Sequence, residues 1–188
     1  MRTLISLILA GFLLTGFISY QDNNPEILKK GADISGMLVE AIMTKLNAEI
    51  RENGLTGAID YCSVHAIPIT DSISKKEQVE ISRVSHKPRN PLNAANKREI
   101  EMIEKYITQQ KEGKQLVPQV VAENGQKTYY SPIVLGSPMC LSCHGEYNNI
   151  DLNVRKVIDE RYPNDKAVDF KLNEVRGMFK IVFDKETD

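Results

Sequence analysis

The sequence contains no tryptophan, and its aromatic residues make up only 6% of 188 positions. A core with so few aromatic rings must be filled mainly by aliphatic side chains, or be completed by a large flat cofactor. The chain also lacks an excess of either charge, since its formal net charge is −1 with acidic and basic residues interspersed. This balance excludes the polybasic surfaces typical of proteins that bind nucleic acids or anionic membranes.

Long hydrophobic runs are scarce as well, with one exception at the start of the chain. Apolar residues account for 41% and charged residues for 26%, which is typical of a folded domain. The segment from Leu4 to Ile18 is almost wholly apolar and follows Arg2. It is short for a membrane span and resembles the core of a signal peptide. We predict that residues 1–20 are a signal peptide or an N-terminal anchor, and that residues 21–188 form one domain in the periplasm or another extracytoplasmic compartment.

Cysteine occurs only three times, as Cys62, Cys140 and Cys143. Cys140, Cys143 and His144 form the C-x-x-C-H pattern of covalent haem attachment. Residues three apart on a helical turn share one face, so both sulfurs can reach the two vinyl groups at one porphyrin edge. The histidine that follows can then bind the iron. The motif predicts one covalent haem c, with Cys140 and Cys143 as its attachment sites and His144 as an axial ligand.

Other uses of these cysteines remain alternatives. Cys140 and Cys143 could form a structural disulfide, or a redox pair that would have no use for His144. A zinc site could combine both with Cys62 and a histidine, although it would lack the usual second C-x-x-C pair. The export segment favours haem, because haem is attached to proteins outside the cytoplasm.

Apolar periodicity, together with proline and glycine positions, predicts helices alternating with strands. Pro68 should kink or break the second helix, and Asn124-Gly125 favours a hairpin. The expected fold is α+β, with an antiparallel sheet of three or four strands, a long N-terminal helix and flanking helices. Helices are expected at residues 25–53, 56–73, 95–112 and 150–160, and strands at residues 78–85, 116–123, 127–135 and 174–183. The first helix could pack on the core, or could form a homodimer or transmit a signal.

The residues alone do not decide which side chain would occupy the sixth position of the iron. Met139 directly precedes Cys140, so it should not reach the opposite face of the haem. Histidine and methionine are common partners in electron-transfer cytochromes. The candidates are Cys62, His65, His86, Met37, Met43, Met102, Met139 and Met178.

Several longer stretches resemble one known family. They are residues 57–69 (GAIDYCSVHAIPI), 81–96 (ISRVSHKPRNPLNAAN), 129–146 and 162–179. The chain is similar to an extracytoplasmic family of single c-type haem proteins with a PAS-like fold, typified by a cyanobacterial protein. The resemblance implies that Cys62 binds the iron as a thiolate opposite His144, which would account for the third cysteine. His65 departs from this pattern and could compete for the iron.

Three basic residues lie close together in the second of these stretches: Arg83, Lys87 and Arg89. We predict that Arg83 and Arg89 pair with the haem propionates, since guanidinium groups bind carboxylates well. A solvated loop is the alternative.

The function that the resemblance implies is redox or gas sensing, through a diatomic ligand and a separate signalling partner. The alternatives are a low-potential electron carrier with a redox partner, a small haem enzyme, and a protein without haem.

Overall fold

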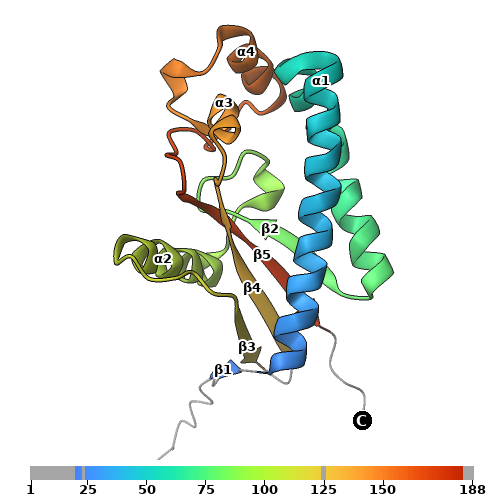
Figure 1. Cartoon of the computed structure of the whole chain (residues 1–188), viewed down its shortest axis with the longest axis vertical. Helices are drawn as coiled ribbons and strands as arrows, with labels where there is room; N and C mark the ends of the chain where they lie inside the picture. The colour runs from blue at the N-terminus through green and yellow to red at the C-terminus, as the bar shows by residue number, and fades with distance from the viewer. Residues whose placement is uncertain (1–19, 23, 124–125, 184–188) are drawn as a thin grey trace, which may run out of the picture.

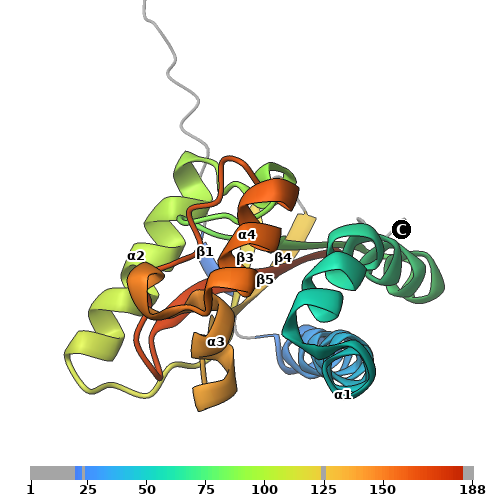
Figure 2. The same cartoon turned by 90° about the horizontal axis from the view of Figure 1, so that it is seen from above.

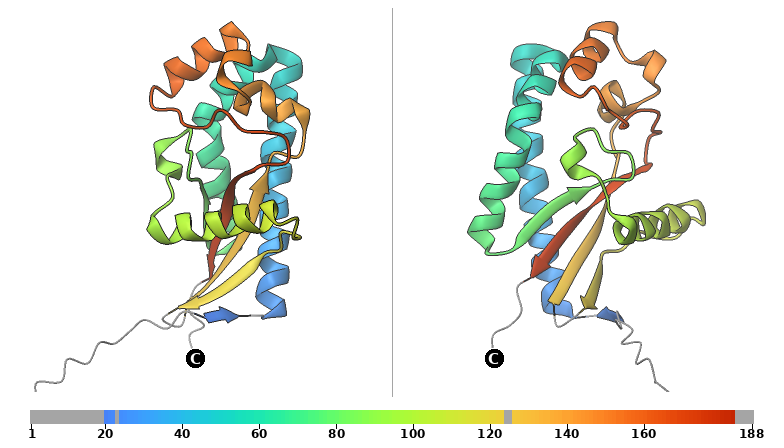
Figure 3. Two further views of the ribbon diagram at one scale, coloured as in Figure 1. Left: turned by 90° about the vertical axis from the view of Figure 1, so that its left-hand side faces the viewer. Right: turned by 180° about the vertical axis from the view of Figure 1, so that it is seen from behind.

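The computed structural model describes residues 20–22, 24–123 and 126–183 of the chain. Its largest element is α1 (Pro25–Glu77), which begins at the Asn24 cap and turns back on itself at Gly54. Gly54 has φ 70°, a left-handed conformation that glycine adopts at little cost. The two halves of α1 therefore run side by side as a helical hairpin (Figures 1 and 3).

An antiparallel sheet of five strands lies beside this hairpin, in the order β1-β3-β4-β5-β2. The long strands β4 (Gln126–Val134) and β5 (Val175–Phe183) form its centre, with a register irregularity between Ile133 and Val134. The edge strands are β1 (Tyr20–Asp22) and β2 (Glu80–Val84), and β3 (Gln119–Glu123) lies between β1 and β4. The end of β4 and the start of β5 lead into the loops that surround the site described below.

The sheet is covered on both faces (Figure 2). On one face α1 packs against a core that includes Tyr129 and Ile181. On the other face α2 (Lys97–Lys111), which starts with a capping box of Asn96 and Glu99, packs against Tyr130 and Met178. Neighbouring residues of a strand point to opposite faces, so Tyr129 and Tyr130 are both buried, one in each core.

The remaining elements gather above the sheet, next to the bend of α1 (Figure 1). They are the short helices α3 (Leu141–His144) and α4 (Leu152–Arg161), with single turns at Pro91–Asn93, Pro138–Cys140 and Tyr147–Asn149. Ile59 of α1 packs with Val154 and Ile158 of α4 in a separate small core. This core ties the second half of α1 to the segment that carries α3.

The packing between α1 and the sheet can be tested at Gly31, where the helix lies close to the ring of Tyr129. A Cβ atom at Gly31 would lie 2.4 Å from the ring of Tyr129, whereas a Cβ atom at Gly36 on the same helix would meet nothing within 4 Å. Gly31→Ala should lower the free energy of unfolding by about 1–2 kcal/mol, because crowding outweighs the gain in helix propensity. Gly36→Ala should raise it by about 0.5–1 kcal/mol. Urea denaturation gives the free energy of unfolding of both variants, and equal changes in the two would contradict the close contact of Gly31 with Tyr129.

The predicted α+β class, with an antiparallel sheet and a long N-terminal helix, is confirmed. The turn at Gly54 lies where the sequence predicts the end of the first helix. Two expectations need correction, and the first is that the second helix continues through Pro68 without a break. The sheet gains β1, a three-residue strand that was not predicted.

Two further expectations fall outside the described part of the chain. The Asn124-Gly125 turn and the segment Leu4 to Ile18 both lie outside the described residues, although β3 and β4 pair on either side of that turn. Among the helices of the described residues, none has the length and apolar character required to span a bilayer.

Candidate functional site

A cavity of about 500 Å³ lies between the bend of α1, the upper ends of β2, β4 and β5, and α3. This volume is within the range of about 300–1,000 Å³ typical of cofactor sites. Its wall is mostly aliphatic, with Ile42, Leu46 and Ile59 from α1 facing residues of the sheet. All six site residues predicted from the sequence line it: Cys62, Arg83, Arg89, Cys140, Cys143 and His144.

The C-x-x-C-H segment forms one compact turn at the edge of this cavity. Ser137 accepts a hydrogen bond from the Met139 amide (3.3 Å), and the single turn Pro138–Cys140 runs directly into α3. Cys140 packs against the core around Phe170, while Cys143 packs against the core of α4. All three cysteines are free thiols. Cys140 and Cys143 are therefore available for covalent attachment.

His144 is held in the tautomer that a metal ligand requires. Its Nδ1 lies 2.7 Å from the carbonyl oxygen of Ala167. A carbonyl can only accept, so Nδ1 carries the proton and Nε2 keeps a free lone pair. Burial lowers the pKa of His144 well below its ordinary value, the charges of Arg89 and Arg176 add to this, and the Ala167 bond opposes it. The imidazole is therefore neutral at pH 7.

Arg89 fastens the histidine turn to the loop that holds it. Its guanidinium donates to the Cys143 carbonyl at 2.6 Å and to Asp165 at 2.9 and 3.1 Å. A longer bond of 3.3 Å reaches Ala167, whose carbonyl is also the partner of His144. Asp165 in turn accepts from the Ala167 amide at 2.8 Å. The bonds of Arg89 thus go to protein groups, and propionate pairing by this residue stays a prediction.

This buried ion pair should matter for stability. The side chains of Arg89 and Asp165 are 13% and 6% exposed. Arg89→Met would leave a buried carboxylate without its cation, which typically costs about 3–5 kcal/mol. The matched control is Arg161→Met, because Arg161 and Asp60 pair at 2.6 Å with side chains 52% and 46% exposed, and such pairs contribute under about 1 kcal/mol. Urea denaturation gives the free energy of unfolding of both variants, and a small loss in both would contradict a stabilising pair of Arg89 and Asp165.

Cys62 lies on the second half of α1, after the bend at Gly54, and lines the cavity. Burial raises the pKa of the Cys62 thiol, and the positive charge of Arg83 opposes that shift. Arg83 itself makes one long bond, of 3.4 Å, to the Ala66 carbonyl. A cation beside a buried thiol favours its thiolate form, which is the form that binds metals.

The other candidates for the sixth position are scattered. Met43 and Met139 line the cavity, whereas His65 is exposed and stacks on Tyr61 with ring centroids 4.3 Å apart. Ala66, not His65, shares the face of Cys62, because the helix continues regularly through this segment. The remaining four do not line the cavity and belong to other clusters or contacts: Met37, His86, Met102 and Met178.

The donor set fits a haem better than it fits zinc. Two thiols one turn apart, a neutral imidazole and a third thiol surround an apolar cavity large enough for a flat cofactor. Within residues 24–123 and 126–183, no group of three or more His, Cys, Asp or Glu side chains is placed to hold a metal ion by itself.

Sequence reasoning missed several residues of the site. Arg176 and Tyr162 line the cavity, but the sequence predicts only that Arg176 belongs to a strand and Tyr162 to a loop. Asp165 and Ala167 lie outside the lining and act through their bonds to Arg89 and His144. No local pattern marks them, because their partners are at least 20 positions away in the chain.

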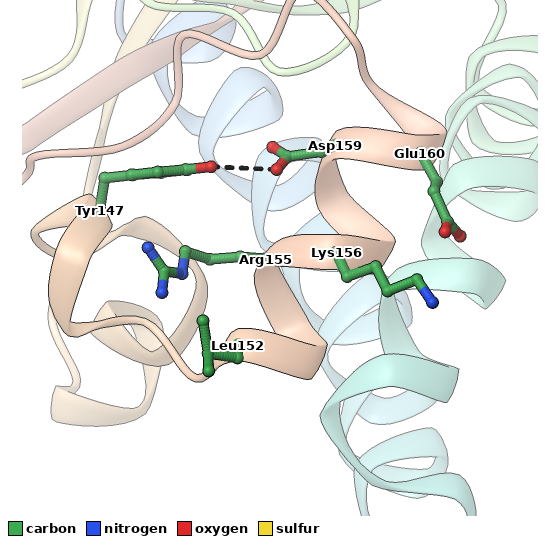
Figure 4. Close-up of a pocket in the computed structure, with 6 residues that line it drawn as sticks. All are labelled: Tyr147, Leu152, Arg155, Lys156, Asp159 and Glu160. Atoms are coloured by element: carbon green, nitrogen blue, oxygen red, sulfur yellow. Dashed lines mark hydrogen bonds between the residues drawn. The ribbon is translucent and has the colours of Figure 1, made fainter.

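A second, shallow pocket on α4 contains none of the predicted residues (Figure 4). The Tyr147 hydroxyl donates to Asp159 at 3.0 Å, and Arg155 lies over the Tyr147 ring. The Tyr147 amide also donates to Asp169 at 2.9 Å. These contacts anchor the chain just after His144, so the pocket supports the site from outside.

The fold and cavity define an α+β domain with a partly buried site, in which two thiols and an imidazole come from one turn. A family model, Tll0287-like, matches residues 19–183, and the chain therefore belongs to the Tll0287-like family. Among solved structures it is similar to the crystal structure of the cyanobacterial heme-protein Tll0287, with a TM-score of 0.60 and 21% identity over 88% of this chain and 99% of that chain. No curated protein matches.

Proposed function

We propose that this protein binds one haem covalently through Cys140 and Cys143, with His144 and Cys62 as iron ligands, and acts in redox or gas sensing outside the cytoplasm. The observation that carries the proposal is the His144–Ala167 bond of 2.7 Å, which frees Nε2 beside two free thiols. Membership of a family named after a haem protein supports the same cofactor. The predicted export segment supports the location.

The ligand set favours a low potential. When bound, haem supplies an iron that exchanges one electron and, in its ferrous form, accepts diatomic gases. A thiolate from Cys62 adds negative charge and so stabilises the ferric form. Cys62 would hold the ferric iron as a thiolate, and in the ferrous protein it would be free to leave and take up a proton. A ligand that binds in one oxidation state and leaves in the other is a two-state element, as a sensor requires.

The place of Cys62 in the fold supports sensing over simple electron transfer. Cys62 lies on the second half of α1, which packs through Ile59 against α4 and continues around Gly54 into the long first half. A shift at Cys62 would therefore act on the longest helix of the domain. A homodimer through that helix, or contact with a signalling partner, would pass the change on.

Catalysis is less well supported. Among the described residues that line the cavity there is no carboxylate, and His144 is the one histidine. A small haem enzyme would need a group to move protons at the open face of the iron. We therefore propose a protein that senses and does not catalyse.

Carbon monoxide binding tests the proposed function. The ferrous protein should bind carbon monoxide readily, and the ferric protein hardly at all, when followed by absorption spectroscopy. His65→Ala should behave like the unsubstituted protein, because His65 lies outside the cavity. A ferrous haem that keeps both protein ligands under carbon monoxide would instead favour the alternative, a low-potential electron carrier.

A further inference from the structure

The charges that line the cavity do not balance. Three arginines reach it, Arg83, Arg89 and Arg176, while no aspartate or glutamate is among its lining residues. Within the described part of the chain, Arg89 alone of the three has a carboxylate in contact, Asp165 at 2.9 Å. A Cys62 thiolate would offset the charge of Arg83 only in part, so buried guanidinium charge remains that an anion would stabilise.

Arg176 shows the imbalance most clearly. It comes from the start of β5 and donates one bond from Nη1 to the Ser85 hydroxyl at 2.6 Å. Its Nε is buried and has no hydrogen-bond partner. Burial lowers the pKa of Arg176 to about 10, and the positive charges of Arg89 and Arg83 act in the same direction while Asp165 opposes them. A guanidinium is seldom left with an unused buried donor unless a ligand completes its bonding.

Arg83 is the second member of the pair. It lies on β2, which pairs with β5, so the two arginines come from neighbouring strands at the same end of the sheet. Its one bond, to the Ala66 carbonyl, is long at 3.4 Å and leaves most of its donors for another partner. A planar guanidinium with free donors binds carboxylates well, often through two parallel bonds.

Given the proposed haem, we propose that Arg176 and Arg83 form a carboxylate-binding subsite that holds the two propionates of the cofactor, while Arg89 serves the histidine turn instead. Two cations without acidic partners match a cofactor with two carboxylates. The assignment adds Arg176 to the site and changes the task expected of Arg89. It depends on the proposed function, because the ligand is part of the same cofactor.

Infrared spectroscopy of the holoprotein tests the subsite directly. Haem whose propionate carboxyls carry ¹³C gives bands that are distinct from those of aspartate and glutamate, and these bands are followed between about pH 5 and pH 8. In Arg176→Gln one labelled carboxyl should take up its proton about one to three pH units higher than in the unsubstituted protein, because its cation is gone. Arg83→Gln should do the same.

The controls separate charge from structure. Arg176→Lys keeps the charge and should hold the labelled carboxyl ionised, whereas Arg161→Met removes an exposed guanidinium outside the cavity and should leave the bands unchanged. In the holoprotein Cys140 and Cys143 would be thioethers, and Cys62 and His144 would hold the iron. Apart from the arginines, Tyr162 is therefore the titratable group left among the described residues that line the cavity, and it carries no label.

Each result decides the question. Unchanged labelled bands in both Arg176→Gln and Arg83→Gln would overturn the subsite, and so would a shift of equal size in Arg161→Met. If Arg176→Gln does not fold, Arg83→Gln and Arg176→Lys still give the comparison between a lost and a retained charge. A protein that carries no covalent haem would refute the proposed function itself, and this is visible before any infrared measurement.

Discussion

Replacing Cys62 with alanine should raise the midpoint potential of the bound haem by on the order of 0.1 V or more, since axial ligands set haem potentials over a range of about 0.8 V. The reason is the loss of a negatively charged ligand that favours the ferric form. Cys62 lines the cavity, where burial raises the pKa of its thiol and the positive charge of Arg83 opposes that rise. Spectroelectrochemical titration gives the potential, and electron paramagnetic resonance of the ferric protein reports whether sulfur is bound.

Two variants on the same helix serve as controls for Cys62. Ser63→Ala removes a hydroxyl that bonds to the Asp60 carbonyl at 2.7 Å and does not line the cavity. His65→Ala removes the ring that stacks on Tyr61. Both should keep the potential and the ferric spectrum of the unsubstituted protein. If Cys62→Ala also keeps them, Cys62 is not an iron ligand and the sensing proposal loses its switch.

Replacing Cys140 and Cys143 together with alanine should reduce the haem that remains on the polypeptide after denaturation by more than about tenfold. Both thiols are free and lie on one turn, so they are the groups placed to form thioether bonds. Haem staining of a denaturing gel measures the retained cofactor. Cys62→Ala is the matched control, because it removes a cavity thiol that we assign to the iron and should retain full staining. Equal staining of the double variant would place the covalent bond elsewhere.

Local patterns predicted most of the secondary structure because each signal acts over a few residues. Asn96 with Glu99 caps α2, and buried Val79 and Ile81 alternate with exposed Glu80 at the start of β2. Pro68 misled because tertiary packing can hold a helix through a proline, while the turn was set by the left-handed φ of Gly54. The strand β1 has three residues, too few to show a pattern.

The site was predictable where chemistry depends on spacing. Cys140, Cys143 and His144 form a contiguous motif, and Cys62 entered through the family resemblance. His65 was a candidate competitor for the iron, but it is exposed and stacks on Tyr61, while Ala66 lines the cavity with Cys62. The pair of Arg89 and Asp165 could not be predicted, because the two residues are 76 positions apart in the chain. The place of Arg176 could not be predicted either, because it depends on which strands pair.

The intact mass of the denatured protein, after maturation in a host with a working haem-attachment system, tests the central claim most directly. We expect the mass of the polypeptide plus a single haem, carried on the turn that contains Cys140, Cys143 and His144. A colourless product with the mass of the bare polypeptide would contradict the cofactor, the ligand set and the sensing role together.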